Sequence, residues 1–148
     1  MYDFMKTAIA EAGKAFDEDD VPVGAVLVKD GLVIARAHNR RNIEKNALLH
    51  AEIIVIDEGC RKLGSRLLEG CDLYVTLEPC PMCAGAIIQS GIRRLYFGAY
   101  DPKAGCAGSV TDLFTLPFNS IPEYYGGIME DECTSLLQEY FKGKRPDT

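Results

Sequence analysis

Four residues in two short segments have the types and spacing of a catalytic metal site. His50 and Glu52 are separated by one residue, and Cys80 and Cys83 by two. An imidazole and two thiolates are preferred zinc ligands, and three protein ligands leave the fourth tetrahedral position open for water. Because zinc lowers the pKa of its bound water to about 7, such a site makes hydroxide available at neutral pH. The set predicts a hydrolytic centre with one Zn²⁺ per subunit.

Glu52 is expected to carry protons rather than to bind the metal. It lies two positions after His50 and comes close beside it if His50 occupies the cap of a helix. A carboxylate that is not a ligand can take a proton from water and deliver it to a leaving amine. Glu52 is therefore the predicted catalytic acid and base.

The Cys80/Cys83 pair taken alone has other interpretations, namely a thiol redox pair, half of a structural zinc site, or two buried thiols. At the start of a helix, both sulfurs would lie on one side of the first turn, where the positive helix end favours thiolates. His50-x-Glu52 upstream and Pro79 directly before Cys80 favour catalytic zinc. The remaining cysteines lack such partners and are expected to be packing or incidental surface thiols; they are Cys60, Cys71, Cys106 and Cys133. His38, at a strand end without a suitably spaced carboxylate, is expected to be structural or exposed.

Composition narrows the class of protein. The 148 residues, 47% hydrophobic and 26% charged, fit a single domain spanning residues 1–148, with a flexible tail after about residue 142. The net charge of −6 and pI of 4.9 argue against a nonspecific nucleic-acid coat protein, although a local basic surface can still bind RNA. No apolar segment approaches the ~18 residues of a membrane helix, and we expect no signal peptide. A cytoplasmic location with reduced cysteines is expected.

The hydrophobic pattern predicts the elements that position these residues. Strands alternate with helices after an opening hairpin at Asp30-Gly31, so we expect an α/β fold with a mixed sheet covered on both faces. An exposed polar loop at 39–46 should lead into the His50 helix, whose Ile53, Ile54 and Ile56 should face mainly inward. Helices are predicted at 2–17, from His50 to near Gly64, and at 80–89, 110–116 and 128–142, and strands at 23–29, 32–37, 72–77, 93–99 and 123–127.

Longer stretches carry a family resemblance. Residues 21–26, 50–53, 73–80, 82–86 and 98–109 together resemble the bacterial tRNA-specific adenosine deaminases, and the likeness runs over residues 4–145. The resemblance implies a three-layer α/β/α cytidine deaminase-like fold with about five strands. It also implies hydrolytic deamination of adenosine to inosine at the wobble position of a tRNA anticodon loop, by a cytoplasmic homodimer that forms the RNA-binding surface.

The same resemblance implies further roles in substrate binding. Asn39 would recognise the base, since its amide offers a donor and an acceptor to a purine edge, although an Asn there can simply satisfy backbone groups. The backbone NH groups of Ala51 and Cys80 would orient the base, and Asp101, in a loop that also reads as an ordinary turn, would lie beside the flanking nucleotides. Basic residues that either contact phosphates or are solvated are Arg93, Arg94, Lys142, Lys144 and Arg145. Residues 46–49 and Ser120 depart from the family pattern.

Three rival functions remain at this stage. A deaminase of a free guanine, cytosine or adenosine compound would use the same zinc chemistry, but the matches around Asn39 and residues 98–109 favour the tRNA substrate. A noncatalytic RNA-binding partner with a structural zinc is disfavoured because Glu52 is retained. A thiol oxidoreductase is the third class, and stoichiometric zinc in the purified protein would count strongly against it.

Overall fold

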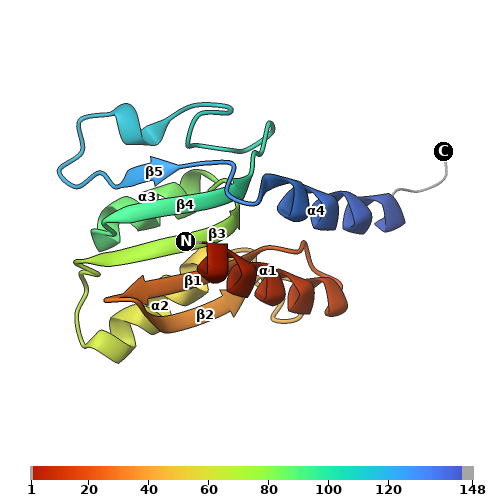
Figure 1. Cartoon of the computed structure of the whole chain (residues 1–148), viewed down its shortest axis with the longest axis horizontal. Coiled ribbons are helices and arrows are strands. Elements are labelled where there is room, and N and C mark those ends of the chain that lie inside the picture. Colours follow the sequence, from red (N-terminus) through yellow and green to blue (C-terminus); the bar gives the residue numbers. More distant parts are fainter. Residues whose placement is uncertain (1, 145–148) are drawn as a thin grey trace.

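A five-stranded mixed sheet forms the centre of the computed structural model, which describes residues 2–144 (Figure 1). The strand order is β2-β1-β3-β4-β5; β1 is antiparallel to both of its neighbours, whereas β3, β4 and β5 run parallel. The sheet confirms the predicted mixed architecture. The strands are β1 (Gly24–Lys29), β2 (Leu32–His38), β3 (Cys71–Leu77), β4 (Arg94–Ala99) and β5 (Glu123–Tyr125).

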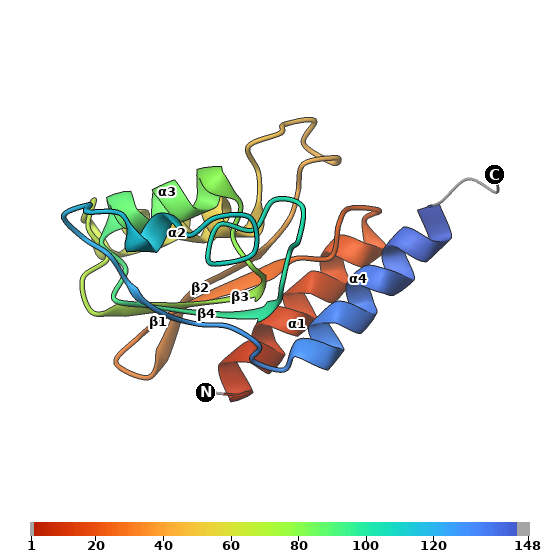
Figure 2. The ribbon, with the colours of Figure 1, turned by 90° about the horizontal axis from the view of Figure 1, so that it is seen from above.

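Helices cover both faces of the sheet and complete the three layers. Helices α2 (Ala51–Leu63) and α3 (Pro81–Ser90) lie on one face, and α1 (Tyr2–Asp17) and α4 (Glu130–Lys144) lie on the other (Figure 2). Each face therefore has its own apolar core, and the larger core lies under α2 and α3. Because β1 lies between these cores, its successive residues Ala25, Val26 and Leu27 are all fully buried.

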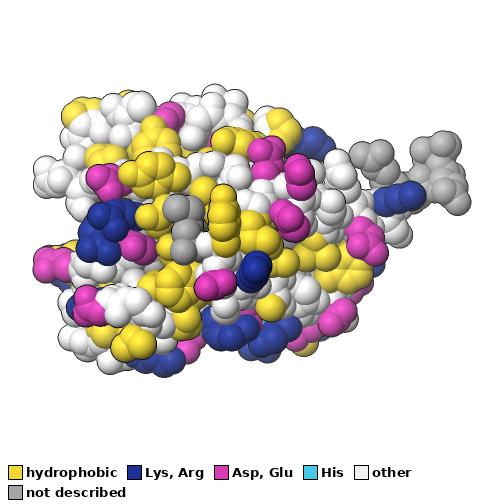
Figure 3. All heavy atoms as spheres, in the orientation of Figure 1, with side chains coloured by type: hydrophobic (Ala, Val, Ile, Leu, Met, Phe, Trp, Pro, Cys, Tyr) yellow, Lys and Arg dark blue, Asp and Glu magenta, His cyan; other side chains and the backbone are white. Residues whose placement is uncertain are grey.

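The face that carries α1 and α4 is only partly covered by them. Apolar side chains remain visible beside α1, surrounded by a mixture of acidic and basic groups (Figure 3). Tyr74, Tyr96 and Tyr125 stack across β3, β4 and β5, with ring centroids 4.6 Å and 5.4 Å apart. Parallel register places these three residues opposite one another. None of the described helices is long and apolar enough to cross a membrane.

The turn and the helix ends follow the sequence signals closely. Asp30 and Gly31 have φ values of 52° and 75°, as a two-residue hairpin turn requires, and Gly64 ends α2 in the left-handed conformation. His50 is the N-cap of α2, and Cys80 is the N-cap of α3 with Pro81 as its first helical residue. Both predicted ligand segments therefore lie at helix starts.

One predicted element is largely wrong. Instead of a helix at 110–116, the chain forms only a short 3₁₀ turn at Leu113–Thr115. Asp112 caps that turn by accepting from the Phe114 backbone NH, and the backbone NH of Val110 bonds to the Gly105 carbonyl. These bonds hold the preceding residues in loop geometry.

Helix α2 confirms a second prediction in part. Ile54 and Ile56 are half-buried and pack against the core, and Val55 and Gly59 are buried. Ile53 is half-buried outside that core, because successive helical residues are 100° apart and three isoleucines this close cannot share one direction. Near the C-terminus, β5 ends at Tyr125, two residues before its predicted end. Helix α4 begins at Glu130, two residues after its predicted start, and continues to Lys144, two residues beyond its predicted end.

Glu11 is a buried carboxylate on α1, remote from the predicted ligands. It is 3% exposed and accepts hydrogen bonds from Lys14 Nζ at 2.7 Å, Arg36 Nε at 2.8 Å and His38 Nδ1 at 3.2 Å. His38 also bonds to Glu18, so it has the structural role expected of it. Burial alone would raise the pKa of Glu11, but the hydrogen bonds from Lys14, His38 and Arg36 outweigh it and hold that pKa below 4.5.

Replacing Glu11 with glutamine is expected to lower the free energy of unfolding at pH 7 by about 1–3 kcal/mol, because three donors lose a charged acceptor. A carboxyl whose folded pKa is depressed stabilises the protein above its unfolded pKa, and that stability disappears as the pH falls through the folded pKa. The difference between wild type and Glu11→Gln should therefore shrink below about pH 4.5. Urea unfolding at several pH values measures it, with the exposed-pair variant Glu58→Gln as control. A difference independent of pH would contradict this account.

Candidate active site

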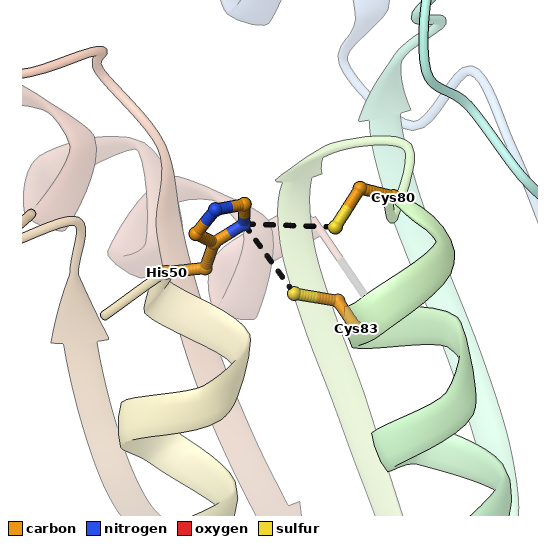
Figure 4. A group of neighbouring side chains, drawn as sticks. All are labelled: His50, Cys80 and Cys83. Carbon is orange, nitrogen blue, oxygen red and sulfur yellow. Dashed lines mark hydrogen bonds between the residues drawn. The ribbon is translucent and has the colours of Figure 1, made fainter. Parts of the chain in front are cut away.

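His50, Cys80 and Cys83 meet where α2 and α3 begin (Figure 4). Their potential ligand atoms all lie within 4.8 Å of one another. His50 Nδ1 is 3.7 Å from Cys80 Sγ and 3.5 Å from Cys83 Sγ. Zinc bonds of about 2.1 Å to nitrogen and 2.3 Å to sulfur, opened to a tetrahedral angle, put those atoms about 3.6 Å apart. The spacing fits one shared Zn²⁺.

The electrostatics of the two thiols also fit a cation. A hydrogen bond from Cys83 lowers the pKa of Cys80 to about 4 against the opposing effect of burial, and His50 assists. The neighbouring Cys80 sulfur and burial raise the pKa of Cys83. Without a cation, Cys80 is thus the thiolate and Cys83 keeps its proton, and a shared Zn²⁺ would favour the thiolate form of both.

Glu52 lies beside these residues without belonging to their ligand group. Its side chain is 3% exposed, and burial raises its pKa to about 7. A carboxyl group with a pKa near neutrality can both accept and donate a proton at physiological pH. The location of Glu52 beside the ligand group and its raised pKa are both properties that a proton carrier requires.

A groove of about 1,090 Å³ opens above these residues. Its floor includes His50, Glu52 and Cys80, and its walls come from the segments after β2 and β4 and from α4. Those segments and the C-terminal half of α4 gather on one side of the molecule in both ribbon views (Figures 1 and 2). The wall residues include Asn39, Arg41, Glu78, Tyr100, Asp101, Lys103, Leu137, Phe141, Lys142 and Lys144.

Comparison with known proteins places this site in a family. Residues 2–142 match the family described as MafB19-like deaminase. The tRNA-specific adenosine deaminase of Bacillus subtilis (strain 168) is 50% identical over 143 residues, which cover 96% of this chain and 89% of the relative. The chain belongs to the tRNA-specific adenosine deaminase family.

Solved structures support the same family membership for this chain. One, from studies of A-to-I editing by tRNA:A34 deaminases at the wobble position of transfer RNA, is 47% identical. It superimposes with a TM-score of 0.88, over 93% of this chain and 100% of that one, which confirms the cytidine deaminase-like fold. A guanine deaminase from Bacillus subtilis is more distant, with 29% identity and a TM-score of 0.65 over 99% of this chain and 95% of that one.

Asn39 lines the deaminase groove, whereas Ala51, to which it is bonded, is fully buried and is not among the lining residues. Asn39 is 4% exposed; its Oδ1 accepts from the Ala51 backbone NH at 2.8 Å, and its Nδ2 donates to the Val21 carbonyl at 3.1 Å. The amide therefore satisfies backbone groups at the strand end, as one interpretation expected. One oxygen lone pair and one amide hydrogen remain for a base, so recognition by Asn39 stays a prediction. The Ala51 NH is already used.

The other predicted contacts divide into two groups. Asp101 lines the groove while its Oδ1 accepts from the backbone NH of Lys103 at 3.0 Å and of Ala104 at 3.2 Å, so it also forms a turn. Lys142 and Lys144 line the groove too. Arg93 and Arg94 instead pair with Asp72 and Glu123 outside it, and Arg145 lies outside the described residues. Within the described residues, the groove is lined neither by the segment 46–49 nor by Ser120.

Several groove residues went unrecognised in the sequence. Thr134, Leu137, Gln138 and Phe141 follow helical spacing on one face of α4, a signal that was available, but only the docking of α4 shows that this face borders the site. Glu78 belongs to the stretch 73–80 that carries the family resemblance, but nothing in the sequence indicated its role. Of the other cysteines, Cys71, Cys106 and Cys133 are buried in the cores and Cys60 is half-buried, as packing thiols should be.

Proposed function

We propose that this deaminase converts adenosine to inosine at the wobble position of a tRNA anticodon loop. The observation that carries the proposal is the set of His50, Cys80 and Cys83 at zinc-binding spacing with buried Glu52 beside it. This set lies in a chain half identical to a tRNA-specific adenosine deaminase. An anticodon base is unpaired, so bringing it into the groove costs little unstacking energy.

The chain's own residues divide the chemistry among them. His50, Cys80 and Cys83 would hold Zn²⁺, which when bound supplies an activated water at neutral pH. Glu52 takes a proton from that nucleophile and delivers it to the departing amine, so that ammonia leaves. Asn39 holds the purine edge with its remaining donor and acceptor. The groove walls keep bulk water from the reacting carbon.

The groove is suited to more than one nucleotide. At about 1,090 Å³ it exceeds the usual size of a small-molecule pocket. Exposed Tyr100 and Phe141 offer faces for bases to stack on. Lys103 and Lys142 form no ion pair within residues 2–144 and can meet phosphates. A chain with net charge −6 thus carries two lysines on this groove that are available to phosphates.

We also propose that the deaminase works as a homodimer in the cytoplasm, where its tRNA substrate is found. Exposed apolar residues near the 3₁₀ turn at Leu113–Thr115 support self-association, because exposed apolar surface favours an interface. Val110, Leu116 and Phe118 are 57%, 46% and 48% exposed. Sedimentation of the purified protein measures the assembly.

A free-base deaminase is the second candidate, because the fold is also that of a guanine deaminase. The test compares turnover of an anticodon stem-loop containing wobble adenosine with turnover of free adenosine, guanine and cytidine, measured as inosine formation and ammonia release. We expect the stem-loop to be preferred by at least about 100-fold, the discrimination that a few additional bound groups provide. Turnover confined to the free compounds would eliminate the tRNA substrate.

A further inference from the structure

Glu78 is a buried carboxylate that the proposed chemistry does not use. It is 2% exposed and lies two residues before Cys80, at the end of β3. Its Oε1 accepts from the Asp101 backbone NH at 2.9 Å, and its Oε2 accepts from the backbone NH groups of Ala107 and Ser109 at 3.0 Å each. The Ser109 hydroxyl also donates to it. One side chain thus satisfies four donors from one loop.

The loop is folded around this carboxylate. A Cβ on Gly105 would lie 2.3 Å from the Glu78 carboxyl carbon, so only glycine lets the backbone pass there. The Cys106 backbone NH donates to the Pro79 carbonyl at 2.8 Å, between Glu78 and the ligand Cys80. The bonds therefore attach the loop at 101–109 directly to the segment that carries a zinc ligand.

The attached loop forms a wall of the groove. Asp101, Pro102, Lys103 and Ala104 line it, and Tyr100 precedes them. The loop is anchored in the apolar core by Cys106 and Ala107, whereas residues 101–104 lie outside that core. The position of residues 101–104 relative to the reacting centre therefore depends strongly on the bond between the Asp101 backbone NH and Glu78. A charged acceptor with several backbone donors gives such a loop a defined conformation.

We propose that Glu78 is a positioning residue that holds the loop at 101–109 in register with the metal-binding segment and thereby sets affinity for the nucleotides flanking the reacting adenosine. This inference rests on the proposed function. Glu78 acts through the loop, whose Asp101 and Lys103 line the groove, so its loss should weaken binding of RNA more than it slows the chemical step.

Glu78→Gln is the main test variant. Glutamine keeps the side-chain volume but replaces one acceptor oxygen with an NH₂ donor, so at least one backbone NH loses its partner in either orientation. We expect KM for the stem-loop to rise about tenfold, with kcat changed less than threefold and zinc content unchanged. Ser109→Ala, which removes only the hydroxyl donor, should give a smaller rise and serves if Glu78→Gln does not fold.

Glu11→Gln is the matched control. Glu11 is an equally buried carboxylate with three donors, but it lies on α1 outside the groove. It should destabilise the protein without changing KM. A rise in KM specific to Glu78→Gln and Ser109→Ala supports positioning. Equal KM values in wild type and in both loop variants overturn it.

Amide hydrogen exchange separates this inference from the proposed function. In Glu78→Gln, exchange should accelerate at Asp101, Ala107 or Ser109, while protection in β3 and α3 is retained. If wild type fails to deaminate the stem-loop, the proposed substrate is wrong, but the exchange experiment still decides whether Glu78 holds the loop. Unchanged exchange at all three amides would refute the positioning role whatever the substrate.

Discussion

Glu52→Ala is expected to lower the deamination rate by about 10²- to 10⁴-fold, the contribution of a general acid and base. Glu52 is 3% exposed, lies outside the metal-binding group and lines the groove beside His50. Its removal takes away the group that carries protons between the attacking water and the leaving amine. Zinc content should remain at one ion per chain, because all three ligands stay in place.

The measurement combines ammonia release, zinc by atomic emission and thermal unfolding. Glu58→Ala is the matched control, since Glu58 lies on the same helix but forms a surface pair with Lys62 at 3.2 Å. It should retain full turnover. Glu52→Ala with wild-type turnover would assign proton transfer to another group, and Glu52→Ala without zinc would make Glu52 part of the metal site.

Cys80→Ala should abolish both zinc binding and turnover. Cys80 and Cys83 share one imidazole partner at distances that fit a single tetrahedral ion, so two remaining ligands would hold zinc poorly. The variant should nevertheless fold, because two apolar cores separated by the sheet support the chain without the metal. We expect a lower Tm, since loss of a ligand that binds only the folded state removes about 4 kcal/mol when zinc stands at 1,000 times its Kd.

Cys60→Ala is the control for this substitution. Its half-buried thiol lies outside the ligand group, so zinc content and turnover should be unchanged. Chelation of the wild-type protein should reproduce Cys80→Ala, and added zinc should restore the wild type alone. Full activity in chelated, zinc-free protein would contradict the proposed chemistry.

The site's centre was predictable because it is encoded locally. His50-x-Glu52 and Pro79-Cys80 each occupy a helix start, where sequence signals are strong and neighbouring residues fix the geometry. The hairpin at Asp30 and Gly31 was equally accessible, since positive φ at both positions restricts the residue types.

The loops and helix faces around the site were less predictable because they depend on tertiary contacts. Apolar residues at 110–116 suggested a helix, but the bonds of Asp112 and Gly105 favour a loop that only the folded chain defines. The isoleucines of α2 indicate its inward side only in part, since the helix also approaches the sheet at Gly59, against which Leu27 packs. The contribution of α4 to the groove depends on how the helix packs beside the loops, which its sequence alone does not show.

The groove combines a floor on regular elements with walls on loops and one terminal helix. Asn39 connects the end of β2 to the start of α2 through its bond from the Ala51 backbone NH, beside the His50 that belongs to the floor. The walls contribute no metal ligand. Substrate range can therefore diverge by exchange of wall residues while the reaction stays the same, which makes this architecture a favourable starting point for directed evolution toward new nucleic-acid targets.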